Sequence, residues 1–108
     1  MDIDLHVHGK LSKSFDFCWQ QFDRMLKAAK EQQLDAVALT EHLHTHRFWD
    51  LYGALDSRYD YNGDYYRVDG LKVFSGVEVT VEESGRRADI LLVGALETMR
   101  RLDELLDP

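Results

Sequence analysis

The sequence alternates short apolar segments with amphipathic ones, and this alternation limits the fold to a few architectures. Four segments have the length and composition of buried β-strands: Ile3–Val7 and residues 35–39, 72–75 and 90–93. Helical segments lie between or after them. Continuous apolar strands that alternate with helices are typical of a parallel sheet in an α/β fold. We therefore predict about four parallel strands with helices, all within one domain that spans residues 1–108.

Three segments are predicted to be helical. The first begins after Asp16, a residue type that caps helix N-termini, and runs to about Gln33. Its apolar face is formed by Trp19, Phe22, Leu26 and Ala29. The second helix covers residues 48–55, with Phe48, Tyr52 and Leu55 on one face, and the third helix starts near Leu96.

Two further features follow from the polar segments. Residues 56–70 are rich in Tyr, Asp and Gly and are expected to form a long structured loop. Directly after the third predicted strand, which covers residues 72–75, Val77, Val79 and Val81 alternate with polar residues. The chain is therefore expected to continue extended as far as a turn at residues 83–87.

The charge of the chain excludes two broad classes of partner. The 108 residues include 20 acidic and 13 basic ones, for a formal net charge of −7. Non-specific binding to nucleic acid or to a membrane surface needs a basic face, so neither is expected of the whole molecule.

The single cysteine and the N-terminus indicate a cytoplasmic protein. Cys18 has no second cysteine to pair with, which fits a reducing compartment. Because it stands among aromatic residues, we expect a buried structural thiol rather than a nucleophile. The acidic N-terminus does not resemble a secretion signal. The longest apolar run, residues 90–96, is too short to span a bilayer.

Potential metal ligands recur where the predicted strands end. His6 and His8 stand two residues apart in the first strand, so both imidazoles would project from one face of the sheet. Acids and a histidine lie next to the other strands: Glu41, His42, Glu78 and Asp89. In parallel α/β folds, ligands bind where the carboxyl ends of the strands open. Two histidines alone fit a half-exposed strand without a function, but this recurrence predicts a site for divalent cations.

Three motifs resemble those of a known family: Asp4-Leu5-His6-Val7-His8, Leu39-Thr40-Glu41-His42 and Gly76-Val77-Glu78. In order and spacing they are similar to the first three motifs of the PHP family (polymerase and histidinol phosphatase). The resemblance implies a distorted (β/α)7 barrel that holds up to three divalent metal ions, Zn, Mn or Fe. It also implies a phosphoesterase that hydrolyses a phosphorylated small molecule or nucleotide, a phosphomonoester or phosphodiester, with metal-activated water.

The resemblance also implies roles for individual residues. His6 and His8 would bind the first metal ion. Glu78 would bridge the first ion to the second, and His42 would bind the third, so both are expected to be catalytic. Asp89 stands where family members often carry a histidine, and we expect it to serve as a further ligand.

The family's later motifs, which are further histidines and a final Asp-x-His, are absent from this chain. The last histidine is His46, and a (β/α) barrel needs roughly 200 residues or more. We therefore expect the N-terminal half of a barrel, inactive alone, that self-associates to cover its open edge, most simply as a twofold dimer. Two alternatives remain open: a non-catalytic metal-binding half-barrel, and an amidohydrolase-type metal hydrolase, whose barrels also begin with His-x-His.

Four other residues have both a functional and a structural interpretation, and a fifth departs from the family's pattern. His44 and His46 would be extra metal ligands or phosphate contacts, or else solvated residues of a loop. Arg86 and Arg87 could each hold a phosphate with two hydrogen bonds, although a charged turn is the simpler interpretation. Lys13 stands near a position where the family usually has an acid or a histidine, and a protonated lysine cannot bind a metal.

Overall fold

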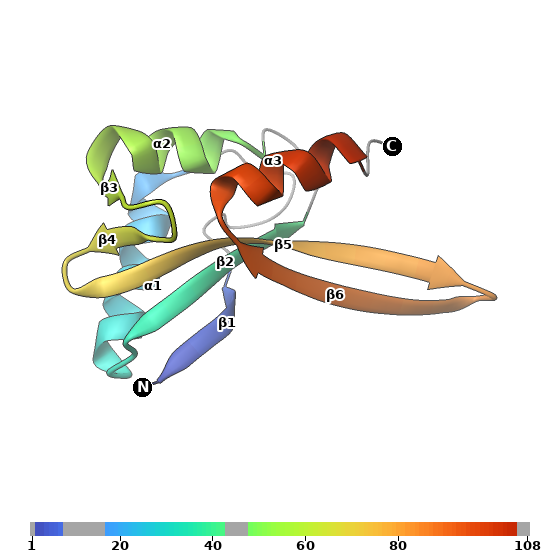
Figure 1. Ribbon diagram of the computed structural model, residues 1–108. Coiled ribbons are helices and arrows are strands. Elements are labelled where there is room, and N and C mark those ends of the chain that lie inside the picture. The colour runs from blue at the N-terminus through green and yellow to red at the C-terminus, as the bar shows by residue number, and fades with distance from the viewer. Residues whose placement is uncertain (1, 8–16, 43–47, 106–108) are drawn as a thin grey trace.

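The described part of the computed structural model, residues 2–7, 17–42 and 48–105, contains six strands and three helices (Figure 1). The strands are β1 (Ile3–Val7), β2 (Ala36–His42), β3 (Asp60–Tyr61), β4 (Tyr66–Val68), β5 (Leu71–Glu83) and β6 (Arg86–Gly94). The helices are α1 (Trp19–Glu31), α2 (Asp50–Arg58) and α3 (Leu96–Leu105). All six strands belong to one sheet.

The sheet is mixed. β1, β2 and β5 are neighbours in that order and run parallel. β4 and β3 continue the sheet beyond β5 in antiparallel pairs, and β6 also pairs antiparallel with β5. The predicted α/β class with a parallel part is confirmed. The prediction that the fourth strand, now β6, is parallel is wrong.

The direction of β6 follows from a two-residue turn. Glu83 pairs with Arg86, so Ser84 and Gly85 alone connect the two strands. Both connecting residues have positive φ, 53° and 78°, which is the combination of a type I′ turn. Such a turn reverses the chain and joins antiparallel strands, whereas parallel strands need a much longer connection. The turn lies where it was predicted, and the outer part of the β5–β6 hairpin projects from the rest of the molecule (Figure 1).

All three helices form the core together with one face of the sheet. The buried helix residues are Phe22, Leu26 and Ala29 of α1, Leu51, Tyr52 and Leu55 of α2, and Met99 of α3. The sheet contributes apolar residues at odd-numbered positions of β2 and β5: Val37, Leu39, Val73 and Val77. The predicted apolar face of the first helix is confirmed. No helix in the described residues is both long and apolar enough to cross a membrane.

Residues 56–70 do not form the predicted loop. α2 extends to Arg58, and β3 and β4 form a short hairpin after it. A second turn, Asp69-Gly70, then joins β4 to β5, with positive φ at both residues (49° and 87°). Asp-Gly is a strong signal for a two-residue hairpin turn, and this dipeptide explains the difference.

The start of α1 also differs from the prediction. The helix begins at Trp19, and the predicted cap, Asp16, lies outside the described residues. Cys18 is exposed rather than buried. Its extended backbone (φ −136°, ψ 121°) precedes the first helical turn, so it does not follow the periodicity that buries Phe22.

Candidate functional site

The carboxyl ends of β2 and β5 bring two predicted site residues together. His42 is the last residue of β2 and is in register with Glu78 of β5. The Nδ1 atom of His42 lies 2.9 Å from Oε2 of Glu78. The side chain of Glu78 is 3% exposed and that of His42 is 34% exposed. The carboxylate is therefore withdrawn from solvent, while part of the imidazole remains accessible.

His42 and Glu78 lie on the face of the sheet opposite the core. Side chains alternate between faces along a strand, and odd-numbered residues of β2 and β5 pack against the helices. The even-numbered His42 and Glu78 therefore project from the other face. Glu41 projects toward the helices and is buried. Of the two polar residues at the end of β2, only His42 lies on the same face as Glu78 and contacts it.

β1 borders the site through its pairing with β2. The hydroxyl of Thr40 donates a hydrogen bond to the carbonyl oxygen of Leu5, at 3.2 Å, and ties the two strands together. The backbone of His6 therefore lies in a strand next to β2. The side chain of His6 and the whole of His8 lie outside the described residues. Their binding of a first metal ion stays a prediction.

Asp89 lies on the same face of the sheet as Glu78 but farther along the β5–β6 hairpin. It is in register with Thr80, two residues beyond Glu78 on β5. The hydroxyl of Thr80 donates a hydrogen bond to Oδ1 of Asp89, at 2.7 Å. Since β6 is antiparallel, its first residues lie toward the projecting turn, so Asp89 is exposed there. Its role as a ligand stays a prediction.

The donor chemistry at this place fits a divalent cation. His42 offers a neutral nitrogen and Glu78 an anionic oxygen, both common ligands of Zn²⁺ and other first-row metal ions. Within the described residues, no group of three or more His, Cys, Asp or Glu side chains is arranged to hold a metal ion. A complete site therefore needs ligands from elsewhere, such as His6 and His8. His44, His46 and Lys13 also lie outside the described residues.

Tyr52 of α2 packs behind the site, and the sequence indicated only a core residue there. Its side chain is fully buried. Its hydroxyl oxygen lies 3.2 Å from the carbonyl oxygens of Leu39 and Gly76, and 3.2 Å from the nitrogen of Gly76. The phenol thus contacts main-chain atoms of both strands that carry the site. The helical periodicity predicted that Tyr52 is buried, but it could not predict the contacts of its hydroxyl.

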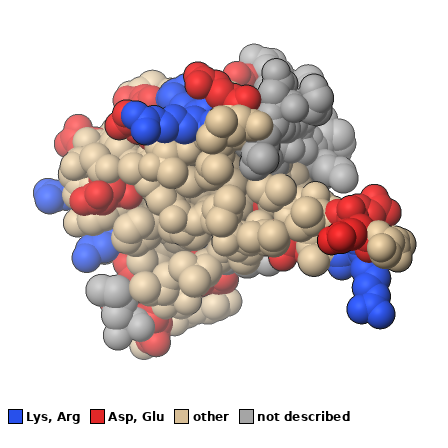
Figure 2. All heavy atoms as spheres, turned by 45° about the vertical axis from the view of Figure 1, so that its right-hand side comes forward, with Lys and Arg blue, Asp and Glu red and all other residues tan. Residues whose placement is uncertain are grey.

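The two arginines considered as phosphate contacts lie at the turn of the β5–β6 hairpin. Arg86 and Arg87 are in register with Glu83 and Glu82, and all four residues are exposed. Figure 2 shows acidic and basic side chains gathered at this projecting end of the molecule. Cross-strand pairs of opposite charge are a usual feature of sheets. The arrangement agrees with the simpler interpretation, a charged turn.

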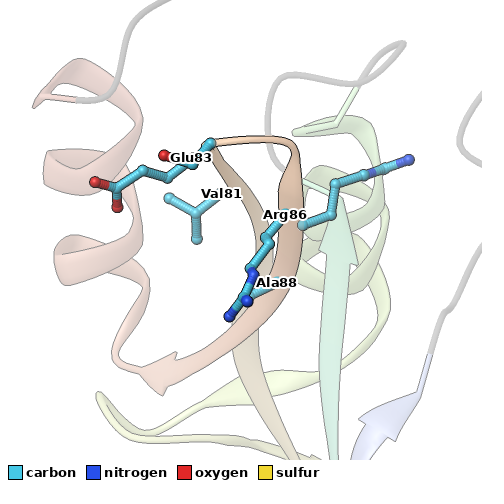
Figure 3. A pocket seen from close by; sticks show the side chains of 6 residues that line it. Val81, Glu83, Arg86 and Ala88 are labelled. Atoms are coloured by element: carbon cyan, nitrogen blue, oxygen red, sulfur yellow. The ribbon is translucent and has the colours of Figure 1, made fainter.

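A hollow of about 820 Å³ lies beside this turn (Figure 3). Its lining residues are Val81, Glu83, Ser84, Arg86, Arg87 and Ala88. It contains none of the predicted metal ligands. The hollow and the His42–Glu78 pair are therefore separate features of the hairpin.

The chain matches one known protein family and a solved structure. Residues 4–106 match the PHP domain, while no curated protein matches the chain. The structure is similar to that of PsfC from Pseudomonas syringae PB-5123, with a TM-score of 0.63 and 32% sequence identity. The similarity covers 72% of this chain and 36% of PsfC, so the chain spans little more than a third of that protein's length. Because the family match extends over nearly all of its residues, the chain belongs to the PHP domain family.

Proposed function

We propose that this chain forms the N-terminal half of a metal-dependent phosphoesterase with a distorted (β/α)7 barrel. The proposal is carried by the 2.9 Å contact between His42 and Glu78 at the carboxyl ends of two adjacent parallel strands. Membership of the PHP domain family supports it. Helices cover the outside of such barrels. The face that carries His42 and Glu78 would therefore be the inner one.

The proposed ligands of the divalent cations are three histidines and two acids: His6, His8, His42, Glu78 and Asp89. When bound, such ions (Zn²⁺, Mn²⁺ or Fe²⁺) lower the pKa of water toward neutrality and act as Lewis acids toward phosphate oxygens. Glu78 supplies negative charge from a buried position, so water does not compete strongly for its oxygens. His42 supplies a neutral donor, which leaves the occupied site positively charged toward a phosphate.

The proposed substrate is a phosphorylated small molecule or a nucleotide. A net charge of −7 disfavours long polyanions. A small phosphate ester would still be attracted, because bound cations reverse the sign of the charge locally. We place this activity in the cytoplasm, where an exposed thiol such as Cys18 stays reduced.

Metal content tests the proposal. Elemental analysis of protein purified without chelators is expected to find a first-row transition metal. Replacing both His6 and His8 with alanine should remove most of it, since the two imidazoles are the proposed ligands of the first ion. His44→Ala combined with His46→Ala is the matched control, because it also removes two imidazoles but should leave the metal content unchanged.

Equal metal content in the His6/His8 double variant and in the unaltered protein would overturn the ligand assignment. Metal binding without hydrolysis of any phosphate ester, in a protein that contains both halves of the barrel, would instead favour the non-catalytic alternative.

We also propose that the isolated chain self-associates through the face that carries the site. Strand register places four partly exposed apolar residues on this face: Ile3, Leu5, Leu91 and Val93. Each is between 36% and 52% exposed. Burial of such a patch is favourable, and a twofold dimer is the simplest closed arrangement.

Light scattering at micromolar concentration is expected to give the mass of a dimer or a larger assembly. Leu5→Ser combined with Leu91→Ser should shift the chain toward the monomer. A monodisperse monomer of the unaltered chain would contradict the proposal.

A further inference from the structure

The hydroxyl of Tyr52 joins the two strands that carry the site. It lies 3.2 Å from the carbonyl oxygen of Leu39 in β2. It lies at the same distance from the carbonyl oxygen and from the nitrogen of Gly76 in β5. A phenol has one proton to donate and can accept as well. It can therefore donate to a carbonyl of either strand while it accepts the N–H of Gly76.

The hydroxyl contacts each strand shortly before its site residue. Leu39 precedes His42 by three residues, and Gly76 precedes Glu78 by two. Over so short a length a strand is nearly rigid. The position of the main chain at these two contacts, together with the pairing of β2 with β5, therefore influences the 2.9 Å separation of the His42 imidazole and the Glu78 carboxylate.

The phenol keeps its proton in this environment. Burial raises the pKa of Tyr52 well above that of an exposed tyrosine. The hydrogen bond with the main chain of Gly76 lowers the pKa by a smaller amount, and the carboxylate of Glu41 raises it further. The raised pKa favours the neutral phenol, which can donate a hydrogen bond. Its contribution does not depend on a change of charge.

The ring is held firmly in place by its own neighbours. Its centroid lies 6.0 Å from that of Phe48 and 5.7 Å from that of Trp49. Trp49 in turn donates a hydrogen bond from Nε1 to Oδ2 of Asp103 in α3, at 2.9 Å. The hydroxyl is thus presented to the sheet by a helix that is anchored to a second helix.

We propose that Tyr52 is a positioning residue, which holds the ends of β2 and β5 at the spacing that lets His42 and Glu78 act together as ligands of the proposed metal site. This inference rests on the proposed function. The competing explanation is a buried tyrosine that contributes to folding alone.

Tyr66 supplies the matched control. It is also fully buried, and its hydroxyl donates a hydrogen bond to Oδ1 of Asp56, at 2.6 Å. It pairs with Val73, at the opposite end of the β2–β5 pairing from the site. Tyr52→Phe and Tyr66→Phe therefore each remove one hydroxyl from a buried phenol, but only the first removes it from behind the site.

The experiment is a titration with Co²⁺ alone, followed by its visible absorption, which reports both affinity and ligand geometry. Tyr52→Phe is expected to weaken Co²⁺ binding about tenfold or more and to change the spectrum, as substitutions behind metal ligands do. Tyr66→Phe should leave both unchanged. Amide hydrogen exchange of the metal-free protein is a second readout. Exchange at residues 41, 42, 77 and 78 should become about fivefold faster in Tyr52→Phe than in Tyr66→Phe.

Equal Co²⁺ affinity and equal exchange in the two variants would overturn the positioning role. Failure of the unaltered protein to bind Co²⁺ would instead contradict the proposed function. In that case the exchange rates at the strand ends would still decide whether Tyr52 sets their position.

Discussion

Replacing Glu78 with glutamine is expected to lower both metal occupancy and phosphoesterase activity, the latter about a hundredfold or more. Glutamine keeps the size of the side chain but removes its negative charge. Glu78 is nearly inaccessible to solvent and lies 2.9 Å from His42. Solvent therefore cannot compensate for the loss of the negative charge. In the proposed role Glu78 would be a ligand of two cations, so the loss of its charge would affect both. Activity would be measured on an aryl phosphate with added Mn²⁺, in a protein that contains both halves of the barrel.

Two variants serve as controls for this substitution. Glu82→Gln makes the same chemical change on the same strand and face, but at an exposed residue near the turn, and should leave activity unchanged. His44→Ala should cost less than Glu78→Gln, because His44 would at most contribute an outer contact. If His44→Ala proves as damaging as Glu78→Gln, the ranking of the ligands is wrong. Activity of the 108-residue chain equal to that of the longer protein would show that the half-barrel is complete by itself.

Local sequence patterns predicted the elements on which the site depends. Period-two alternation and continuous apolar runs identified β1, β2 and the start of β5, and the helical stripe containing Phe22 and Leu26 identified α1. These three strands are the parallel ones. Because carboxyl ends of parallel strands meet at one edge, the sequence could also predict that His42 and Glu78 lie near each other.

The antiparallel part of the sheet was harder to predict, because its direction depends on turns rather than on apolar segments. Each turn is encoded by only two residues, Asp69-Gly70 and Ser84-Gly85. All four residues have positive φ. The first dipeptide is a recognised hairpin signal that outweighs the polar composition around it. Without it, residues 56–70 resemble a loop, and an apolar run such as that in β6 fits a parallel strand equally well.

The contacts behind the site depend on tertiary structure and could not be predicted. Tyr52 looks like any other apolar-face residue of an amphipathic helix. Its role follows from the distance of its hydroxyl to Leu39 and Gly76, residues separated from it by 13 and 24 positions. In the same way, Asp89 was placed next to a strand end, whereas its hydrogen bond to Thr80 depends on the register of a hairpin.

Gly76→Ala is expected to destabilise the protein by about 1–3 kcal/mol, the usual cost of inserting a methyl group into a packed interior. A Cβ atom at this residue would lie 2.7 Å from the carbonyl oxygen of Leu92 and 2.9 Å from Cγ2 of Thr40. Both distances are well inside the 3.5–4.0 Å of favourable carbon contacts. The glycine of the third motif is therefore required by the close approach of β2 and β6 on either side of β5.

The two obstacles differ in how far they can move. Leu92 is in the β5–β6 ladder, so its carbonyl group cannot retreat without breaking the pairing next to Glu78. Thr40 is fully buried, and its hydroxyl is bonded to β1. Thr40→Ser removes Cγ2 but keeps the hydroxyl. Added to Gly76→Ala, it should recover only part of the lost stability, because the contact with Leu92 remains.

Gly53→Ala provides the control, since this exposed glycine of α2 has no atom within 4 Å of an added Cβ. There the same substitution should stabilise the protein by up to about 1 kcal/mol, the difference in helix propensity between glycine and alanine. Urea unfolding measures the free energy of unfolding of all three variants. Equal stability of Gly76→Ala and Gly53→Ala would contradict the close packing of β2, β5 and β6. Opposite signs at the two glycines would support steric exclusion as the reason that the third motif begins with glycine.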